Sequence, residues 1–374
     1  MRIAIFAHSF IADWNHGNAH FLRGIAVELQ SRGDEVSLYE PRESWSLGNL
    51  IRDYGEGVVE SFRQHYPSLS SKRYDLHSLD LHKELEGTDL IIVHEWNDPQ
   101  LVRKIGEYRS KTASCRALFH DTHHRSVTDP EAMSAFDLSN YDGVLAFGEI
   151  IRQIYLRRCW ARRVWTWHEA ADTRIFSPRQ NTQKQGDLVW IGNWGDEERS
   201  EELWEFLVGP VKVLRLRCRV HGVRYHEQAL KMLQNGGIEY AGWVPNYRVP
   251  EVLSQFRVTV HIPRRPYVEA LPGIPTIRIF EALSCGIPLV CSPWSDCEKL
   301  FREGEDYLIA KSGRQMKDVL NDLLRDDEFA LEMAQSGFKA VLERHTCSHR
   351  VDELIMICTE LGLKTSDIGH RQVR

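Results

Sequence analysis

One segment of the chain, residues 273–290, carries residue types that suit a diphosphate joined to a ribose. A loop with Gly273 and Pro275 precedes helical spacing at residues 277–284. The free backbone N–H groups and the positive dipole end of that helix would lie at the loop. Glu281, about one turn further on, offers a carboxylate that can accept hydrogen bonds from both ribose hydroxyls. The alternative is an ordinary helix in which Glu281 is a solvated charge.

A second polar group follows a predicted strand at residues 116–119 and contains His120, Asp121 and His123. Histidine and aspartate side chains at a strand end can take part in acid–base chemistry. The His-x-x-His spacing can also bind zinc, but the spacing indicates no fourth ligand and no Cys pair accompanies it. Polar residues at the surface end of a strand are the remaining alternative.

Two further polar clusters follow predicted strands. His16, Gly17 and His20 lie between the first strand and the first helix, where Gly17 permits close backbone approach. Glu95 and Trp96 follow the strand at residues 90–93. An aromatic ring beside polar groups suits the partly apolar face of a sugar, although the core is the commoner place for a tryptophan. The first loop has no Gly-x-Gly-x-x-Gly pattern, which disfavours a dinucleotide-dependent dehydrogenase.

The composition is that of a globular protein with about two domains. The chain has 374 residues, of which 42% are hydrophobic and 27% charged, and its net charge is −6. That charge disfavours a nucleic-acid-binding protein, which usually presents a basic face. Eight cysteines without a Cys-x-x-Cys pair indicate buried free thiols. Apolar runs stay far below the roughly 20 residues of a membrane span. Residues 1–7 are too short an apolar run for a secretory signal, so we expect a cytoplasmic protein.

Short apolar runs alternate with amphipathic stretches along the chain, which predicts an α/β fold of two doubly wound, Rossmann-like domains. In the first half we predict a helix at residues 19–31 and strands at 2–7, 35–39, 90–93, 116–119, 143–147 and 164–167. In the second half we predict strands at 188–191, 211–214, 238–241, 258–262 and 288–291, and helices at 201–207, 225–233, 249–255, 277–284, 313–324, 328–343 and 348–361.

A polar stretch without periodicity at residues 176–187 has the composition of a linker. We therefore predict a first domain at residues 1–178 and a second domain at residues 179–345. Ligands of open α/β sheets bind beyond the carboxyl ends of the strands, so a cleft between the two domains is the expected site.

The segment at residues 273–290, with Glu281-Ala282 followed by Gly286 and Pro288, resembles the donor-site segment of GT-B glycosyltransferases of family 4 (group 1) and of the related spore-maturation (CgeB-like) type. Further segments fall in the order of that family at residues 167–178, 191–194, 241–245 and 345–357. The resemblance covers nearly all of the second half and, more weakly, the first. It implies the GT-B fold, in which residues 346–374 form a closing helix and tail that return to the first domain.

The resemblance implies roles for individual residues. His120 would face the transferred sugar, while Asp121 or His123 would orient that sugar or contact the acceptor. His16, His20, Glu95 and Trp96 are candidates for acceptor contacts. The donor-binding candidates are Gly17, Gly192, Asn193, Arg199, Val244, Arg264, Gly273, Ile274, Pro275, Thr276 and Glu281.

The chain departs from the family pattern at two places. Family-4 enzymes usually carry Glu-x7-Glu, but Gly273 occupies the position of the first glutamate. The Gly-Arg…Lys pair usual after residues 191–192 is also missing. Arg199 is our candidate for the diphosphate, since a guanidinium fork suits phosphate, and Arg264 or Arg265 is the alternative. Arg199 could equally be a surface ion-pair residue beside residues 196–198.

No Asp-x-Asp motif occurs in the chain. The other common glycosyltransferase fold uses that motif to hold a metal ion on the diphosphate. We therefore expect a metal-independent transferase without a cofactor, for which the nucleotide-sugar donor is a co-substrate. The family-4 resemblance further implies that the anomeric configuration is retained. A sugar-nucleotide epimerase of the GT-B type is the alternative, as is a degenerate GT-B protein that binds a nucleotide without catalysis.

Residues 150–165 contain five arginines among Ile, Leu, Tyr and Trp. Such a basic, aromatic stretch can contact an anionic membrane surface, which would suit a lipid-linked acceptor. A carbohydrate or a small-molecule acceptor is equally compatible with the sequence. A half-solvated helix that leads into a strand is the alternative interpretation of these residues.

Overall fold

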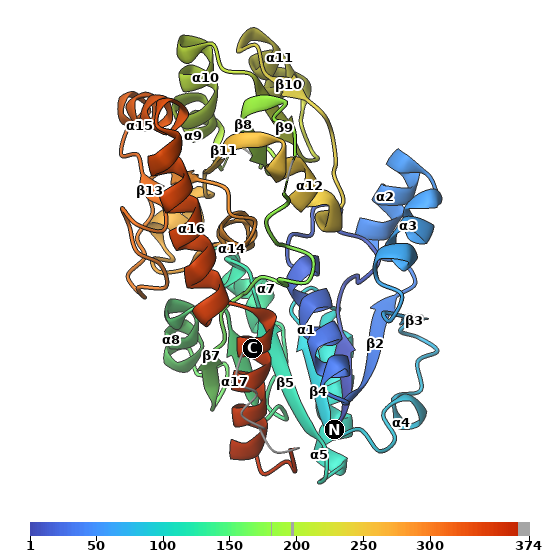
Figure 1. Ribbon diagram of the computed structural model, residues 1–374. Coiled ribbons are helices and arrows are strands. Elements are labelled where there is room, and N and C mark those ends of the chain that lie inside the picture. The colour runs from blue at the N-terminus through green and yellow to red at the C-terminus, as the bar shows by residue number, and fades with distance from the viewer. Residues whose placement is uncertain (181, 196–197, 366–374) are drawn as a thin grey trace. The chain divides into compact units, whose positions relative to one another are not determined.

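The structure is a computed structural model that describes residues 1–180, 182–195 and 198–365. The chain divides into two compact units, each of which contains one parallel sheet (Figure 1). Unit 1 comprises Met1–Ala12, Leu22–His168 and the chain from Cys347, and unit 2 comprises Asp13–Phe21 and Glu169–Thr346.

The sheet of unit 1 has the strand order β3-β2-β1-β4-β5-β6-β7. Its strands are β1 (Arg2–Phe6), β2 (Glu35–Pro41), β3 (Ser71–Tyr74), β4 (Leu90–His94), β5 (Arg116–Asp121), β6 (Gly143–Ala146) and β7 (Val164–Thr166). The helices are α1 (Ala19–Ser31), whose first residues belong to unit 2, α2 (Trp45–Tyr54), α3 (Gly57–His65), α4 (Leu81–Glu84), α5 (Pro99–Lys111), α6 (Arg125–Thr128), α7 (Pro130–Ser134), α8 (Glu149–Arg157) and α17 (Cys347–Glu360).

The last helix, α17, packs within unit 1 although it follows unit 2 in sequence. The indole Nε1 of Trp167 donates to the backbone carbonyl of Arg350 at 2.8 Å. Arg32, at the end of the first helix, forms an ion pair with Asp352 at 2.5 Å. These contacts join the C-terminal helix to segments that lie far away in sequence.

Unit 2 has the strand order β10-β9-β8-β11-β12-β13. The strands are β8 (Gly186–Ile191), β9 (Cys218–His221), β10 (Glu239–Tyr240), β11 (Phe256–His261), β12 (Leu289–Cys291) and β13 (Leu308–Ile309). The helices are α9 (Ser200–Leu203), the π-helix η1 (Trp204–Val208), α10 (Gly209–Leu214), α11 (Glu227–Asn235), the 3₁₀-helix η2 (Asn246–Arg248), α12 (Val249–Ser254), α13 (Arg265–Glu269), α14 (Ile277–Ser284), α15 (Gly313–Arg325) and α16 (Asp327–Arg344).

Every strand pairing in both sheets is parallel. The predicted α/β fold with two doubly wound sheets is therefore confirmed. None of the helices in the described ranges combines the length and the apolar character that crossing a bilayer requires.

Residues 169–178 lie in unit 2, although the sequence pattern assigned them to the first domain. The backbone N–H of Ala171 donates to the carbonyl of His345 at 3.0 Å, and Ala171 forms a parallel bridge with Thr346. Phe176 is fully buried and stacks on the imidazole of His20 with a centroid distance of 3.9 Å. The polar, linker-like part of the chain therefore follows residues 169–178, which are packed in unit 2.

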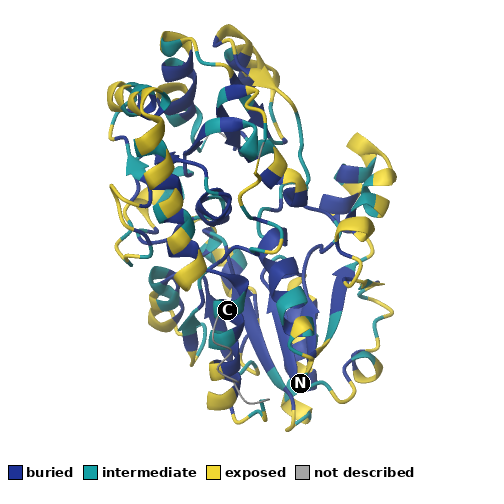
Figure 2. Ribbon diagram, viewed as in Figure 1, coloured by how far each residue is buried: buried dark blue, intermediate teal, exposed yellow. Residues whose placement is uncertain are grey.

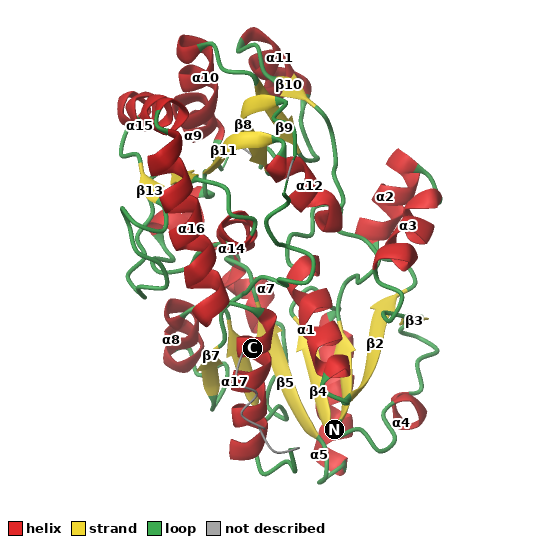
Figure 3. Ribbon diagram, in the orientation of Figure 1, coloured by secondary structure: helices red, strands yellow, loops and turns green. Residues whose placement is uncertain are grey.

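The strand predicted at residues 211–214 is wrong, because these residues belong to helix α10 (Figure 3). Pro210 lies where the π-helix η1 passes directly into α10, and it lacks the N–H that an interior helix residue would donate. Leu207 and Val211 are both buried, which fits the four-residue spacing of one helix face. The strand β9 instead begins at Cys218. Its sequence contains Arg219 and therefore lacks the apolar run from which a strand would be predicted.

Among the described helices of unit 2, α14 is the most completely buried (Figure 2). All its residues except Arg278 are buried. Helix α16 packs on it at Gly337, where an added Cβ would lie 2.7 Å from Leu283 Cδ2 and 2.8 Å from the carbonyl oxygen of Asp306. This close approach fixes the depth at which α14, and with it Glu281, sits in the unit.

We predict that Gly337→Ala lowers the melting temperature, because the methyl group would force α16 away from α14 at a typical overpacking cost of about 1–3 kcal/mol. Gln335→Ala changes an exposed residue of the same helix and is the matched control. Thermal unfolding of the two variants side by side makes the measurement. Equal melting temperatures would contradict tight packing at Gly337.

Candidate active site

In unit 2, the loops after the parallel strands β8, β9 and β10 meet at one edge of the sheet. Asn193, just after β8, accepts a hydrogen bond at Oδ1 from the backbone N–H of Val223 at 2.9 Å. Its Nδ2 donates to Asn15 Oδ1 at 2.5 Å. These loops and the segment from Asp13 line one small hollow, to which the predicted donor residues Gly17, Gly192, Asn193 and Val244 and the predicted acceptor residue His16 all contribute.

Asp13 holds the early loop in this place. Its carboxylate accepts from the indole Nε1 of Trp243 at 2.8 Å and from the backbone N–H of Asn246 at 3.0 Å. A Cβ on Gly17 would lie 3.4 Å from a methyl of Ile277 at the start of α14. The glycine thus lets the loop backbone lie close to the helix.

The carboxylate of Glu281 is the best-defined feature of this region. Its side chain is 1% exposed, and Oε1 lies 3.1 Å from Nδ1 of His20. Arg278, one turn earlier on α14, forms an ion pair with Oε2. The other ring nitrogen of His20 accepts the backbone N–H of Asp172 at 2.9 Å. Because that nitrogen accepts, the proton of a neutral His20 ring sits on Nδ1 and points to Glu281.

The pKa of Glu281 lies below its ordinary value, so the group is a carboxylate at neutral pH. Burial alone raises this pKa, but the charge of Arg278 and the hydrogen bond from His20 outweigh that effect. The result is a buried anion with two fixed partners, which costs less than an unpaired one. Each carboxylate oxygen can accept a further hydrogen bond besides the one from His20 or Arg278.

Arg278 connects Glu281 to the hollow at the strand ends. It lines that hollow and also a second one, whose wall includes Glu281, His261 and the apolar side chains of Val249 and Leu289. His261 Nε2 lies 3.0 Å from the hydroxyl of Thr276, which precedes α14. Burial, with Arg199 and Arg278 nearby, lowers the pKa of His261 to about 3, so its ring is neutral.

Arg199, our candidate for the diphosphate, uses its guanidinium on the protein itself. Nη1 donates to the carbonyl of Ile262 at 2.8 Å, Nη2 to that of Asn193 and Nε to that of Trp194 at 3.3 Å. Burial, and then the charge of Arg264, lower its pKa to about 9. The structure thus places Arg199 as a clamp between the loops after β8 and β11.

Arg264 and the loop before α14 complete this edge. Arg264 forms an ion pair with Glu198 at 3.1 Å and is about one-fifth exposed. Gly273 has a φ of +89°, and a Cβ there would lie 2.8 Å from Sγ of Cys297. This conformation explains why a glycine, rather than the family's glutamate, can stand at residue 273 in this chain. Ile274, Pro275 and Thr276 follow it into the helix.

Unit 1 contains a separate buried polar cluster. His94 of β4 is paired in register with His120 of β5, and the ring of His120 meets that of Trp167 edge to face at 5.0 Å. Burial lowers the pKa of His120 to about 3. Asp121 Oδ2 accepts from the hydroxyl of Tyr155 at 2.8 Å. His120 and Asp121 are both fully buried.

Glu95 lies beside this pair and is held by other groups. It accepts from the backbone N–H of Thr122 at 2.9 Å and forms an ion pair with Arg125 at 2.8 Å. Burial raises the pKa of both Glu95 and Asp121, and the nearby charge of Glu95 raises that of Asp121 further. Trp96 packs between the guanidinium of Arg125, at 4.1 Å, and the ring of His123, at 5.0 Å.

In the histidine-rich stretch, the rings of His123 and His124 lie 3.9 Å apart. His120 lies against Trp167, His123 against Trp96, and His124 Nδ1 lies 2.9 Å from the hydroxyl of Thr128. Within the described ranges, no three His, Cys, Asp or Glu side chains are gathered as metal ligands.

The residues predicted from sequence are divided between the two units. The donor-binding candidates all lie in unit 2, whereas His120, Asp121, His123, Glu95 and Trp96 lie in unit 1. His20, expected at the acceptor, is instead buried beneath Glu281. Sequence reasoning missed Asp13, His261 and Arg278. Only Arg278 had a usable signal, because it precedes Glu281 by three residues and therefore shares its helix face.

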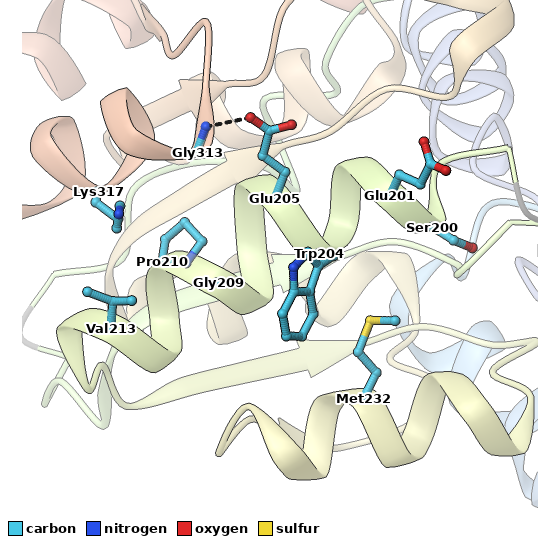
Figure 4. Close-up of a pocket in the computed structure, with 10 residues that line it drawn as sticks. All are labelled: Ser200, Glu201, Trp204, Glu205, Gly209, Pro210, Val213, Met232, Gly313 and Lys317. Carbon is cyan, nitrogen blue, oxygen red and sulfur yellow. Dashed lines mark hydrogen bonds between the residues drawn. The ribbon is translucent and has the colours of Figure 1, made fainter.

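A larger hollow of about 620 Å³ lies elsewhere in unit 2, among α9, η1, α10, α11 and α15 (Figure 4). Trp204, 48% exposed, and Met232 form part of its wall, and Glu205 caps α15 through the backbone N–H of Gly313 at 2.8 Å. None of the predicted site residues lines it. The volume of a hollow therefore does not identify the candidate site in unit 2. Its position at the carboxyl ends of the parallel strands does.

Comparison with known proteins agrees with this geometry. Residues 199–356 match a family model described as glycosyl transferase-like. No curated protein matches the chain. Among solved structures, sucrose-phosphate synthase from Thermosynechococcus elongatus aligns with a TM-score of 0.65 at 14% identity, covering 97% of this chain and 99% of that one.

Two other solved structures align over similar lengths. A glycosyltransferase from Rickettsia africae has a TM-score of 0.67 at 9% identity, with 97% of this chain and 99% of that one covered. HepE from Anabaena, in complex with UDP and glucose, has a TM-score of 0.66 at 12% identity, with 96% and 100% covered. These structures show that the chain has the GT-B fold, and residues 199–356 carry the match to the glycosyl transferase-like family.

We predict that Arg199→Met lowers the stability of the protein by about 1–3 kcal/mol, because the buried carbonyls of Asn193 and Ile262 lose their donor. Lys212→Met, at an exposed position of α10, is the control. Chemical unfolding of both variants provides the comparison. If Arg199→Met were as stable as the control, the guanidinium would not clamp the loops and would be available for a phosphate.

Proposed function

We propose that the protein transfers a sugar from a nucleoside diphosphate sugar to a carbohydrate, lipid-linked or small-molecule acceptor. We propose further that it needs no metal ion or cofactor and retains the anomeric configuration. The observation that carries the proposal is the ionised, buried Glu281 beside Arg278, next to the loops at the carboxyl ends of the unit 2 strands.

The ribose would use the Glu281 carboxylate. Hydrogen bonds from a hydroxyl to a charged acceptor are stronger than neutral ones, and a carboxylate held by two partners needs no reorganisation to receive them. His20 and Arg278 supply that preorganisation. The apolar wall around Val249 and Leu289 would suit one face of a base.

The diphosphate would use positive groups at the same edge. Arg278 lines both hollows, and Thr276 leaves the first turn of α14 without a side-chain cap because its hydroxyl faces His261. Guanidinium and helix N–H groups can together neutralise the charge that develops on a leaving diphosphate. Arg199 supports this edge indirectly, through the loops that it clamps. HepE, which shares the fold, is a structure with UDP and glucose.

The groups that act on the transferred sugar are proposed to come from unit 1. His120 is neutral because burial lowers its pKa to about 3, so it would act as a hydrogen-bonding group rather than as a charge. Asp121 and His123 follow it directly at the carboxyl end of β5. The proposed retention of configuration is supported by the family-4 resemblance of the donor segment.

We predict that Glu281→Ala weakens nucleoside diphosphate binding at least tenfold. Two charge-assisted hydrogen bonds at about 1.5–3 kcal/mol each are lost, and about 1.4 kcal/mol corresponds to a factor of ten. Calorimetry with UDP, GDP and ADP on the wild type first identifies the base. Glu332→Ala, at an exposed position of α16, is the control for loss of one carboxylate. Unchanged affinity in folded Glu281→Ala would remove this residue from the site.

We predict that sugar transfer is unaffected by EDTA, because arginine side chains and helix N–H groups carry the diphosphate charge. The assay compares treated and untreated enzyme with the same donor. Loss of turnover that Mg²⁺ or Mn²⁺ restores would show that the metal-free proposal is wrong.

The same assay separates the alternatives. A sugar-nucleotide epimerase would convert the donor into an isomeric nucleotide sugar without any acceptor. A degenerate protein would bind the nucleotide and leave the donor intact. Release of free nucleoside diphosphate together with a glycosylated or hydrolysed sugar is the outcome that the proposed transfer predicts.

A further inference from the structure

Unit 1 carries a basic groove outside the buried polar cluster, between α8, β7 and α17. It has a volume of about 570 Å³, and its wall includes Arg152, Arg162, Arg163, Trp165 and Met356. The sequence placed only residues 150–165 in a basic stretch. The structure adds the C-terminal helix, which contributes Met356 from the other side of the groove.

The arginines of this surface are available to an outside partner. Arg157, Arg158, Arg162 and Arg163 are exposed, and in the part of the chain that the structure describes none of them pairs with a carboxylate. Arg158 stacks over the ring of Trp160 at 5.1 Å. Four unpaired guanidinium groups repel one another and attract an anion. This local charge stands out in a chain whose net charge is −6.

In the part of the chain that the structure describes, no carboxylate forms an ion pair with Arg162 or Arg163. Glu360 accepts from the indole Nε1 of Trp165 at 3.0 Å. Glu353 pairs with Arg350. Glu149, at the start of α8, pairs with Arg152 at 2.7 Å. The groove therefore keeps a positive side formed by Arg162 and Arg163.

Two apolar side chains stand out beside the same arginines. Met356 is 63% exposed and Leu156 is 37% exposed, and both line the groove. Exposed apolar side chains next to unpaired arginines suit the interface of an anionic bilayer, where the chains enter the headgroup layer and guanidinium forks bind phosphate. A nucleic acid would use the charge but not the aliphatic side chains.

We propose that this groove binds the phosphate headgroups of anionic phospholipids and that Leu156 and Met356 enter the membrane interface beside them. The site lies within unit 1 and goes beyond the proposed sugar transfer. Its occupation needs neither donor nor acceptor, so this proposal and the proposed function can fail separately.

Vesicle co-sedimentation of the full chain tests the proposal. The wild type is expected to bind vesicles of phosphatidylcholine mixed with phosphatidylglycerol and to leave vesicles of phosphatidylcholine alone in the supernatant. The double variant R162E/R163E is expected to lose at least tenfold in binding. R215E/R217E, which makes the same charge change on exposed residues of unit 2, is the matched control and is expected to bind like the wild type.

A second variant, L156S/M356S, keeps every charge and is expected to bind more weakly than the wild type. Circular dichroism and melting temperature establish that each variant is folded. Absence of wild-type binding to the anionic vesicles would overturn the proposal, as would equal losses in R162E/R163E and the control. Unchanged vesicle binding by L156S/M356S would also overturn it. So would a wild type that binds duplex DNA instead of vesicles, if R162E/R163E abolishes that DNA binding.

Discussion

The hydrogen-bonded group of His20, Glu281 and Arg278 is the interaction on which the rest of unit 2 depends. A carboxylate that is 1% exposed is tolerated only when its charge is balanced. Arg278 supplies the balancing charge from the same helix, and His20 supplies a directed hydrogen bond from the start of α1. The backbone N–H of Asp172 in turn fixes the orientation of the His20 ring. One ion thus ties two distant segments, those of His20 and Asp172, to helix α14.

Unit 1 also contains buried carboxylates, but their surroundings shift the pKa in the opposite direction. Its buried carboxylates, Glu95 and Asp121, have raised pKa values, since burial is only partly offset by Arg125 and by the hydroxyl of Tyr155. Unit 2 therefore stabilises the anion of Glu281, whereas in unit 1 burial disfavours the charged forms of Glu95 and Asp121 at the carboxyl ends of β4 and β5. This division matches the proposed division of labour, in which one unit binds the charged nucleotide and the other supplies groups for the sugar.

The sequence predicted the parts of the molecule that local patterns encode. The bounds of α1 and α14 were predicted without error because both helices carry long apolar faces. β3 and β9 were missed, since an exposed edge strand such as Ser71–Tyr74 has no apolar run, and Arg219 interrupts the other. The partnership of His20 with Glu281 joins residues 261 positions apart, and no local pattern reports such a contact. Arg199 was assigned to phosphate on residue type alone, but its burial directs it to backbone carbonyls.

The central claim is that the fixed carboxylate of Glu281 receives the ribose hydroxyls of the donor. Comparison of the affinities for a nucleoside diphosphate and its 2′-deoxy form, in the wild type and in Glu281→Ala, tests this claim most directly. The account predicts that the wild type prefers the ribose form by about tenfold, the worth of one such hydrogen bond, and that Glu281→Ala does not distinguish the two. Equal discrimination by both proteins would show that another group reads the ribose.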